Sequence, residues 1–168
     1  MDSHGRRRVQ ELVDRFAVID AVYAWCRAID RRAWDAMRDL LTPSVDIDYS
    51  SNGSVAGVMT SDAWIARLSI LHGFDATLHM VTNVSPAVTA HGATCTSYVN
   101  AMHFLDDQDG REWHAFACGI YEHSLVRDGS RWKISGATFT LAGRHGGRDA
   151  FDQAFERARA LAHPHSAP

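Results

Sequence analysis

Three side chains able to do acid–base chemistry lie where the sequence pattern calls for apolar residues. His79 sits in the short apolar stretch DATLHMVTN, and on a strand it shares one face with Asn83. His103 lies on an apolar face of the following predicted strand, and Asp30 ends a long predicted helix. A lone histidine on an apolar face is more often a packed core residue than a catalyst. Three inward polar groups in one small fold favour a shared function.

Asp30 follows an apolar stripe that recurs at steps of three and four residues, which is typical of an amphipathic helix. At about 100° per residue, Asp30 lies within about 40° of the later members of that stripe. An inward carboxylate costs several kcal/mol unless a partner hydrogen-bonds it. Either the helix end frays into solvent or Asp30 meets a donor, and an imidazole backed by a carboxylate is a tuned general base. The stripe that we expect to face the core consists of Val9, Leu12, Val13, Phe16, Ile19, Tyr23 and Cys26.

Rival chemistries find little support in the spacing of the residues. No HxH or HExxH pattern occurs in a suitable element, so we expect no metal site. The nucleophile pattern GxSxG is absent, and Cys118 on an apolar strand is typical of packing. No strand, glycine loop and helix follow one another as nucleotide binding requires. We therefore expect no cofactor.

Composition narrows the class of protein further. The 168 residues suit one domain, with 46% hydrophobic and 22% charged residues. A net charge of −3 gives no basic field for nucleic acid or an anionic membrane, so we expect neither partner. The three cysteines form no paired spacing, and no apolar run has the length of a signal peptide or membrane helix. We expect a cytoplasmic protein.

The order of elements predicts an α+β fold. Periodicity predicts helices over 9–30, 31–41, 60–74 and 148–162, and strands over 44–51, 78–90, 93–107, 112–126 and 131–142. The last four strands are separated by turn residues, as in consecutive hairpins. To bury its apolar face, such a sheet has to curl around the helices and leave a cone with a cavity. We expect a single domain over 9–162, with flexible tails at 1–8 and 163–168.

Five stretches together resemble the scytalone dehydratase branch of the NTF2-like (SnoaL-like) superfamily, over nearly all of 9–162. They are YAWCRAIDRRAWDAMRDLLTPSVDIDYSS, TLHMVTN, MHFL, DGSRWKISG and FDQAFERAR. The resemblance implies a cone-shaped barrel whose curved mixed or antiparallel sheet wraps around a long N-terminal helix, closed by a C-terminal helix. It implies catalytic roles for Asp30, Tyr49, His79 and His103, and substrate contacts for Trp25, Phe151 and Phe155. We expect Asn83, on the face of His79, to contact the substrate as well.

The sequence also departs from that family's pattern. Ile29 stands where scytalone dehydratase has a tyrosine, and its pocket serine and asparagine align without a gap to Cys118 and Ile120. One carbonyl-polarising tyrosine and one hydrogen-bonding group are therefore missing by this alignment. The resemblance then implies a different and more apolar substrate, or a shift toward isomerisation or ring closure.

The residues and the resemblance favour a cofactor-free dehydratase acting on a small, largely apolar molecule of polyketide or terpenoid type. In this hypothesis His79 removes a proton next to a carbonyl, Asp30 orients His79, Tyr49 stabilises the enolate, and His103 protonates the departing hydroxyl. A cyclase or isomerase using the same pocket is the alternative, and a non-catalytic binding or assembly module is the second. The resemblance also implies a homodimer or homotrimer that covers the outer face of the sheet.

Overall fold

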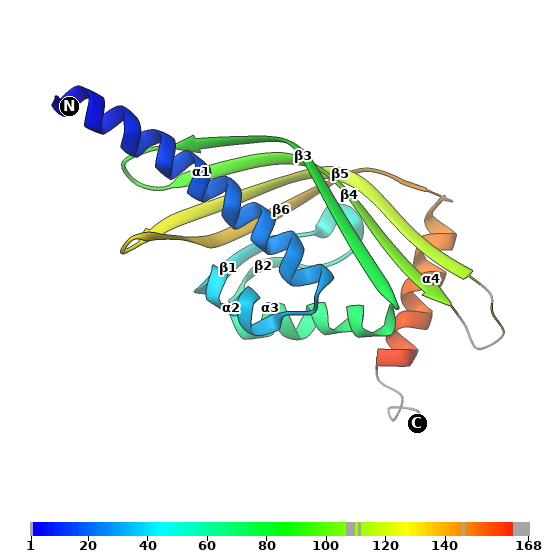
Figure 1. The fold of residues 1–168 in the computed structure, drawn as a ribbon. Helices are drawn as coiled ribbons and strands as arrows, with labels where there is room; N and C mark the ends of the chain where they lie inside the picture. The colour runs from blue at the N-terminus through cyan, green and yellow to red at the C-terminus, as the bar shows by residue number, and fades with distance from the viewer. Residues whose placement is uncertain (1, 107–109, 111, 146, 163–168) are drawn as a thin grey trace.

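A six-stranded sheet curls around one long helix in the computed structural model of the chain, which describes residues 2–106, 110, 112–145 and 147–162 (Figure 1). The strands follow the spatial order β2-β1-β6-β5-β4-β3. Neighbours are antiparallel except β1 and β6, which are parallel, so the expected mixed sheet is confirmed. The strands are β1 (Leu41–Asp48), β2 (Ala56–Thr60), β3 (Ala76–Val88), β4 (Ala93–Asp106), β5 (Glu112–Asp128) and β6 (Arg131–His145).

The helices lie on one face of this sheet and at its end. The longest, α1, crosses the sheet and packs mainly on β3 and β6, while α4 stands at the far end of the long strands (Figure 1). This placement confirms the α+β cone with a closing C-terminal helix. The helical elements are α1 (Ser3–Asp30), α2 (Trp34–Leu40), η1 (Ser50–Asn52), α3 (Ser61–Leu68), η2 (Ser69–Gly73) and α4 (Gly147–Ala162).

The contact between η2 and α4 depends on a glycine. A Cβ atom placed on Gly73 would lie 1.8 Å from the backbone oxygen of Ala158. Any side chain there would push α4 away from η2, because the obstacle is backbone and cannot rotate aside. Gly73 therefore sets how closely α4 closes the cone.

The face of α1 that enters the core differs from the expected one. Val9, Leu12, Val13 and Phe16 are exposed, the last at 67%. The residues that α1 does bury are Asp14, Val18, Ala21, Val22, Trp25, Cys26, Ala28 and Ile29. The physical reason is that the sheet covers the other side of α1, where Asp14 pairs with Arg127 of β5 and Val18 is fully buried, so the expected stripe points to solvent.

Several element boundaries also differ from expectation. The helix α1 begins at Ser3, capped by the Asp2 side chain, so the expected tail at 1–8 is mostly helical. The first strand begins at Leu41 rather than at 44, and the short edge strand β2 was not expected at all. The helix expected over 60–74 divides into α3 and the 3-10 helix η2. The tail expected at 163–168 and most of the turn DDQDG lie outside the described residues.

The inner and outer faces of the long strands alternate as the sequence predicts. Along β4, every second residue from Ala93 to Leu105 is buried, and His103 belongs to that inner set. On the outer face, Leu78, Met80, Tyr98 and Ile120 are between 41% and 55% exposed. None of the described helices combines the length and apolar character that crossing a membrane requires.

Candidate active site

The C-terminal end of α1 and the strand β3 bring Asp30 and His79 together. The His79 Nδ1 atom lies 2.7 Å from Asp30 Oδ1, and the His79 backbone N–H donates to Asp30 Oδ2 at 2.9 Å. The Thr77 hydroxyl donates to Oδ1 at 3.0 Å. Burial favours the neutral form of Asp30, but the hydrogen bonds from His79 and Thr77 outweigh it and lower the pKa of the carboxyl. Asp30 is therefore a carboxylate at neutral pH.

The carboxylate fixes the tautomer of His79. A carboxylate only accepts hydrogen bonds, so the Nδ1 of His79 carries the proton that it shares with Asp30. The remaining nitrogen, Nε2, then has a free lone pair. The His79 side chain is 5% exposed and lines the central cavity, so this lone pair is available to a molecule bound there.

Arg32 holds this end of α1 against the sheet, and sequence reasoning did not single it out. Its guanidinium donates to the backbone oxygens of Asp30 at 2.8 Å, Leu71 at 2.9 Å and Phe74 at 3.0 Å. A longer contact of 3.3 Å reaches the Thr77 hydroxyl. The Arg32 backbone has a φ of 51°, a left-handed conformation that reverses the chain after α1. A basic residue that follows a helix usually lies at the surface, so the sequence alone does not predict that Arg32 anchors the end of α1.

His103 faces the same cavity in a different state. Its Nδ1–H donates to the backbone oxygen of Ala115 at 2.9 Å, because a carbonyl can only accept. Burial lowers the pKa of His103 to about 3, and the neighbouring His79 adds to the shift. The ring is neutral at physiological pH, and its Nε2 is an acceptor. The expected role as a proton donor to a leaving group does not fit this tautomer.

Two tyrosines line the cavity from the sheet side. Tyr49, just after β1, packs against Trp64 with ring centroids 5.1 Å apart, and against Tyr121 of β5 at 6.2 Å. No hydrogen bond of good geometry satisfies the Tyr49 hydroxyl, although Tyr121 lies near enough to influence its pKa. Burial raises the pKa of both hydroxyls. Both are therefore protonated donors at neutral pH.

Tyr121 corrects an expectation from the ungapped alignment. Cys118 and Ile120 are both exposed on the outer face of β5 and do not line the cavity. The residues of β5 that do line it are Ala117 and Tyr121. Strand parity is the reason, because a shift of one residue moves every side chain to the opposite face. A tyrosine from β5 thus lines the cavity that Ile29 of α1 also lines.

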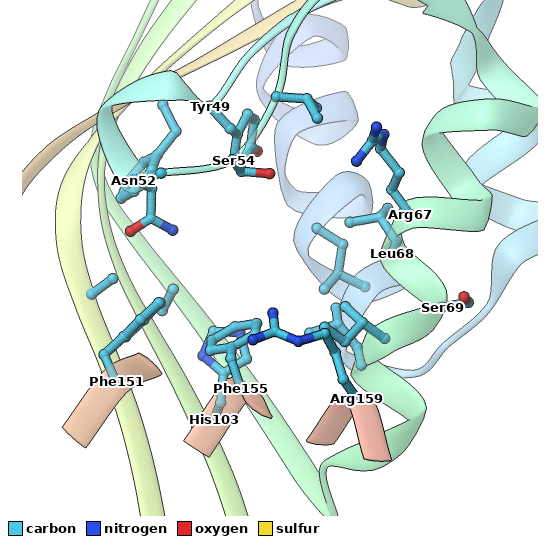
Figure 2. Close-up of a pocket in the computed structure, with 18 of the residues that line it drawn as sticks. Tyr49, Asn52, Ser54, Arg67, Leu68, Ser69, His103, Phe151, Phe155 and Arg159 are labelled. Carbon is cyan, nitrogen blue, oxygen red and sulfur yellow. The ribbon is translucent and has the colours of Figure 1, made fainter. Parts of the chain in front are cut away.

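The cavity itself measures about 1080 Å³. In Figure 2, His103, Phe151 and Phe155 lie on one side of it, Tyr49, Asn52 and Ser54 on the opposite side, and Arg67 and Leu68 of α3 on a third. Phe151 and Phe155 of α4 stack with centroids 4.7 Å apart, and both line the cavity. A cavity of this size accommodates a drug-sized molecule.

Two expected substrate contacts lie elsewhere. Trp25 is completely buried, stacks on Trp64 at 6.2 Å and meets the edge of His123 at 5.2 Å, so it is a core residue behind the cavity wall. Asn83 is exposed with a φ of 53°, where the pairing of β3 with β4 shifts register. This bulge turns Asn83 away from the face that it would share with His79 on a regular strand. Among the described residues, no group of three metal-ligating side chains gathers.

A family model described as the SnoaL-like domain matches residues 10–138, and the chain belongs to the SnoaL-like family. The uncharacterized protein Rv2910c of Mycobacterium tuberculosis is 30% identical over 131 residues, which cover 75% of this chain and 84% of that protein.

Solved structures share the fold. The Kfla4162 protein from Kribbella flavida superposes with a TM-score of 0.76 at 23% identity, covering 89% of this chain and 99% of its own. A candidate scytalone dehydratase from Novosphingobium aromaticivorans gives 0.70 at 19% identity, covering 82% and 90%. A type 2 hexachlorocyclohexane dehydrochlorinase gives 0.65 at 14% identity, also covering 82% and 90%.

Proposed function

We propose that this protein is a cofactor-independent lyase, most specifically a dehydratase, acting on a small and largely apolar metabolite of polyketide or terpenoid type. The observation that carries the proposal is the 2.7 Å contact between His79 Nδ1 and Asp30 Oδ1 at the wall of a large cavity. A carboxylate behind one imidazole nitrogen makes the other nitrogen a base. The names of the structural neighbours are consistent with this chemistry but describe those proteins alone.

The first step is removal of a proton from carbon. His79 Nε2 takes a proton from the carbon next to a carbonyl group, and Asp30 stabilises the imidazolium that forms. General base help of this kind contributes about 10²–10⁴-fold to a rate. The electron pair of the broken C–H bond moves to the carbonyl oxygen, which becomes an enolate.

The enolate oxygen needs donors, and Tyr49 and Tyr121 provide them. Both hydroxyls remain protonated because burial raises their pKa values. The Tyr49 hydroxyl is buried without a partner of good geometry, so bonding to a ligand removes an existing cost. Donors placed where charge develops lower the barrier more than donors in water do.

The second step expels the hydroxyl on the next carbon. His103 is neutral, so its Nε2 orients this hydroxyl by accepting its hydrogen bond. The proton that His79 took then passes to the departing oxygen, which leaves as water while the enolate reforms the carbonyl with a new C=C bond. Proton and charge balance within the site, and no external reagent is consumed.

A β-hydroxy ketone tests the proposal directly. 3-Hydroxy-1-tetralone loses water to give 1-naphthol, so mass spectrometry detects the reaction. We expect the wild type to accelerate this loss, and His79→Ala or Asp30→Asn to remove the acceleration while keeping the fold. Full turnover by a folded His79→Ala protein would refute the assignment. A rearranged product of unchanged mass would instead favour the cyclase or isomerase alternative.

A further inference from the structure

The N-terminal part of α1 has two apolar sides. One side faces the sheet, where Val18 is fully buried and Asp14 pairs with Arg127 of β5. The other side points to solvent, and its apolar residues are 48% to 67% exposed: Val9, Leu12, Val13 and Phe16. We call these four residues the outer stripe. At about 100° per residue, the centre of the outer stripe lies about 170° around the helix from Val18, so the contacts that hold α1 to the sheet leave it uncovered.

The outer stripe has a defined end. Ile19, the next apolar residue, is already half-buried. Asp20 lies about one turn beyond Phe16 and within about 30° of the centre of the outer stripe, so a carboxylate ends the apolar surface there. Contiguous exposed apolar surface of this kind marks a site of interaction. Any contact therefore involves the first half of α1 rather than its whole length.

Arginines border the outer stripe on both sides. On the same helical projection, Arg6 lies about 70° to one side of the centre and Arg8 about 90° to the other, with Arg15 about 20° from Arg8. All three residues are exposed. Within the described part of the chain, none of the three forms an ion pair. Their charges are therefore available to a partner.

The acidic residues of the same stretch do not neutralise these arginines. Glu11 projects about 150° from the centre of the outer stripe, and Asp14 is already paired with Arg127. The Asp2 side chain caps the helix by accepting from the Gly5 backbone N–H. Up to Asp20, the solvent side of α1 is thus apolar along its middle and basic along its borders.

We propose that the outer stripe docks α1 on the surface of an anionic phospholipid bilayer, with Arg6, Arg8 and Arg15 beside the lipid phosphates. A helix whose apolar face is bordered by cations lies in the plane of such an interface. Guanidinium groups also bind phosphate oxygens well, because their donors match the geometry of the acceptors. The net charge of the whole chain is −3, so the attraction comes from the local placement of the arginines. The proposal does not depend on the proposed function.

The charges favour a lipid surface over a second copy of this chain. Two outer stripes in contact would bring the arginines of both copies together, and like charges at the borders of a helix pair oppose pairing. Nucleic acid supplies the phosphates but offers its backbone rather than an apolar surface to such a helix. An anionic bilayer supplies both the apolar layer and the negative charge.

Vesicle flotation tests the proposal with the whole chain. One probe is a vesicle of phosphatidylcholine alone, and the other contains equal parts of phosphatidylcholine and phosphatidylglycerol. We expect the wild type to bind the anionic vesicles about tenfold or more tightly than the neutral ones at low salt. The preference should shrink as salt is raised. Equal binding to the two kinds of vesicle, or binding to neither, would overturn the proposal.

A matched pair of variants tests the apolar part of the contact. Leu12→Gln/Val13→Gln should weaken binding to the anionic vesicles about tenfold or more, because less apolar surface enters the interface. The control Leu161→Gln/Val58→Gln changes the same residue types at positions that are 48% and 72% exposed on α4 and β2, and it should bind as the wild type does. All four positions are exposed, so urea unfolding should be unchanged in both variants and shows that they are folded.

A second pair tests the basic borders. Arg6→Gln/Arg8→Gln should lose most of the preference for anionic vesicles. The control Arg31→Gln/Arg131→Gln removes the same charge from exposed positions outside α1 and should keep the preference. Wild-type binding by the variants of the outer stripe and of its borders would show that this side of α1 is not the docking surface.

Light scattering without vesicles distinguishes a lipid surface from a second copy as the partner of the outer stripe. Leu12→Gln/Val13→Gln should leave the size of the wild-type assembly unchanged, because the proposed contact is with lipid. A smaller assembly in this variant would show that another copy of the chain covers the outer stripe, and the lipid proposal would then be wrong.

Discussion

His79 and His103 face each other with ring centroids 5.6 Å apart and planes at 82°, yet their Nδ1 atoms are bound to different acceptors. His79 pairs with the Asp30 carboxylate, whereas His103 donates to the Ala115 carbonyl. A carboxylate stabilises an imidazolium far better than a backbone carbonyl does. In the proposed mechanism the two rings therefore have different roles: His79 gains and returns a proton, and His103 stays neutral.

Asp30→Asn should separate orientation from charge. The amide keeps the shape of the carboxylate but loses the negative charge that stabilises protonated His79. We expect turnover to fall about 10²–10⁴-fold with little change in substrate affinity. Asp30→Ala should also lower the free energy of unfolding, by about 1–3 kcal/mol, because the donors on His79 and Thr77 lose their acceptor. Steady-state kinetics and urea unfolding check the two effects, and unchanged turnover in Asp30→Asn would contradict the pairing.

Tyr49→Phe should cost activity without costing stability. The hydroxyl of Tyr49 is buried without a well-formed hydrogen bond, so its removal leaves the unfolding free energy unchanged or raises it slightly. The loss of one enolate donor should lower turnover about 10–10³-fold. Tyr121→Phe should behave similarly. Parallel losses of stability and activity would instead identify these tyrosines as packing residues.

Much of the fold follows from strand periodicity and turn residues. The four long hairpin strands and the inward directions of His79 and His103 could be predicted from this pattern. The expectation that Phe151 and Phe155 lie at the pocket follows instead from the family resemblance. The partner of Asp30 could be inferred because a buried carboxylate requires one. Apart from the two phenylalanines, each of these features follows from a local sequence pattern or from the free-energy cost of burying a polar group, so a single sequence is enough to predict it.

Other features depend on tertiary contacts. Apolar residues occupy more than one face of α1, so periodicity cannot tell which face the sheet covers. The edge strand β2 has almost no buried residue and no alternation to detect, with Gly57 at a φ of 132°. Arg32 makes contacts with chain segments that follow it by about forty positions, at Leu71 and Phe74. Tyr121 was missed because an ungapped alignment placed the wrong strand face in the pocket.

Arg32→Ala should loosen the active site from a distance. The substitution removes the hydrogen bonds to the backbone oxygens of Asp30, Leu71 and Phe74, at a cost of about 2–3 kcal/mol in unfolding free energy. Turnover should fall as well, because Asp30 loses the anchor that positions it. The neighbouring Arg31→Ala is the control, since Arg31 is exposed and makes none of these contacts. Equal unfolding free energies for the two variants would show that Arg32 does not anchor the end of α1.

Stability should decline with acidity because of buried histidines. Burial lowers the pKa of His123 from 6.5 to about 4, and no hydrogen bond satisfies either ring nitrogen. Between pH 6.5 and about pH 4, His123 binds a proton in the unfolded chain but stays neutral in the folded chain. Stability is therefore fully present above pH 6.5 and falls by about 1.4 kcal/mol per pH unit for each such histidine.

His123→Phe keeps a ring against Trp25 and Tyr121 and should flatten this slope in urea unfolding from pH 7 to 4.5. The exposed His91→Gln should leave it unchanged, and equal slopes in the two variants would contradict the assignment.

The outer face of the sheet should carry a contact between copies of this chain. Leu78, Met80, Tyr98 and Ile120 come from three adjacent strands and expose 41% to 55% of their surfaces. Exposed apolar patches of this kind mark interaction surfaces, and symmetric self-association is the commonest way to cover one. We expect a homodimer or homotrimer in light scattering, shifted toward monomer by Tyr98→Glu/Ile120→Glu. Val58→Glu, at a 72% exposed residue on the edge strand β2, introduces the same charge away from this face and should leave the assembly intact. A wild-type chain that is monomeric at high concentration would refute the expectation, since the exposed face would then have no partner copy.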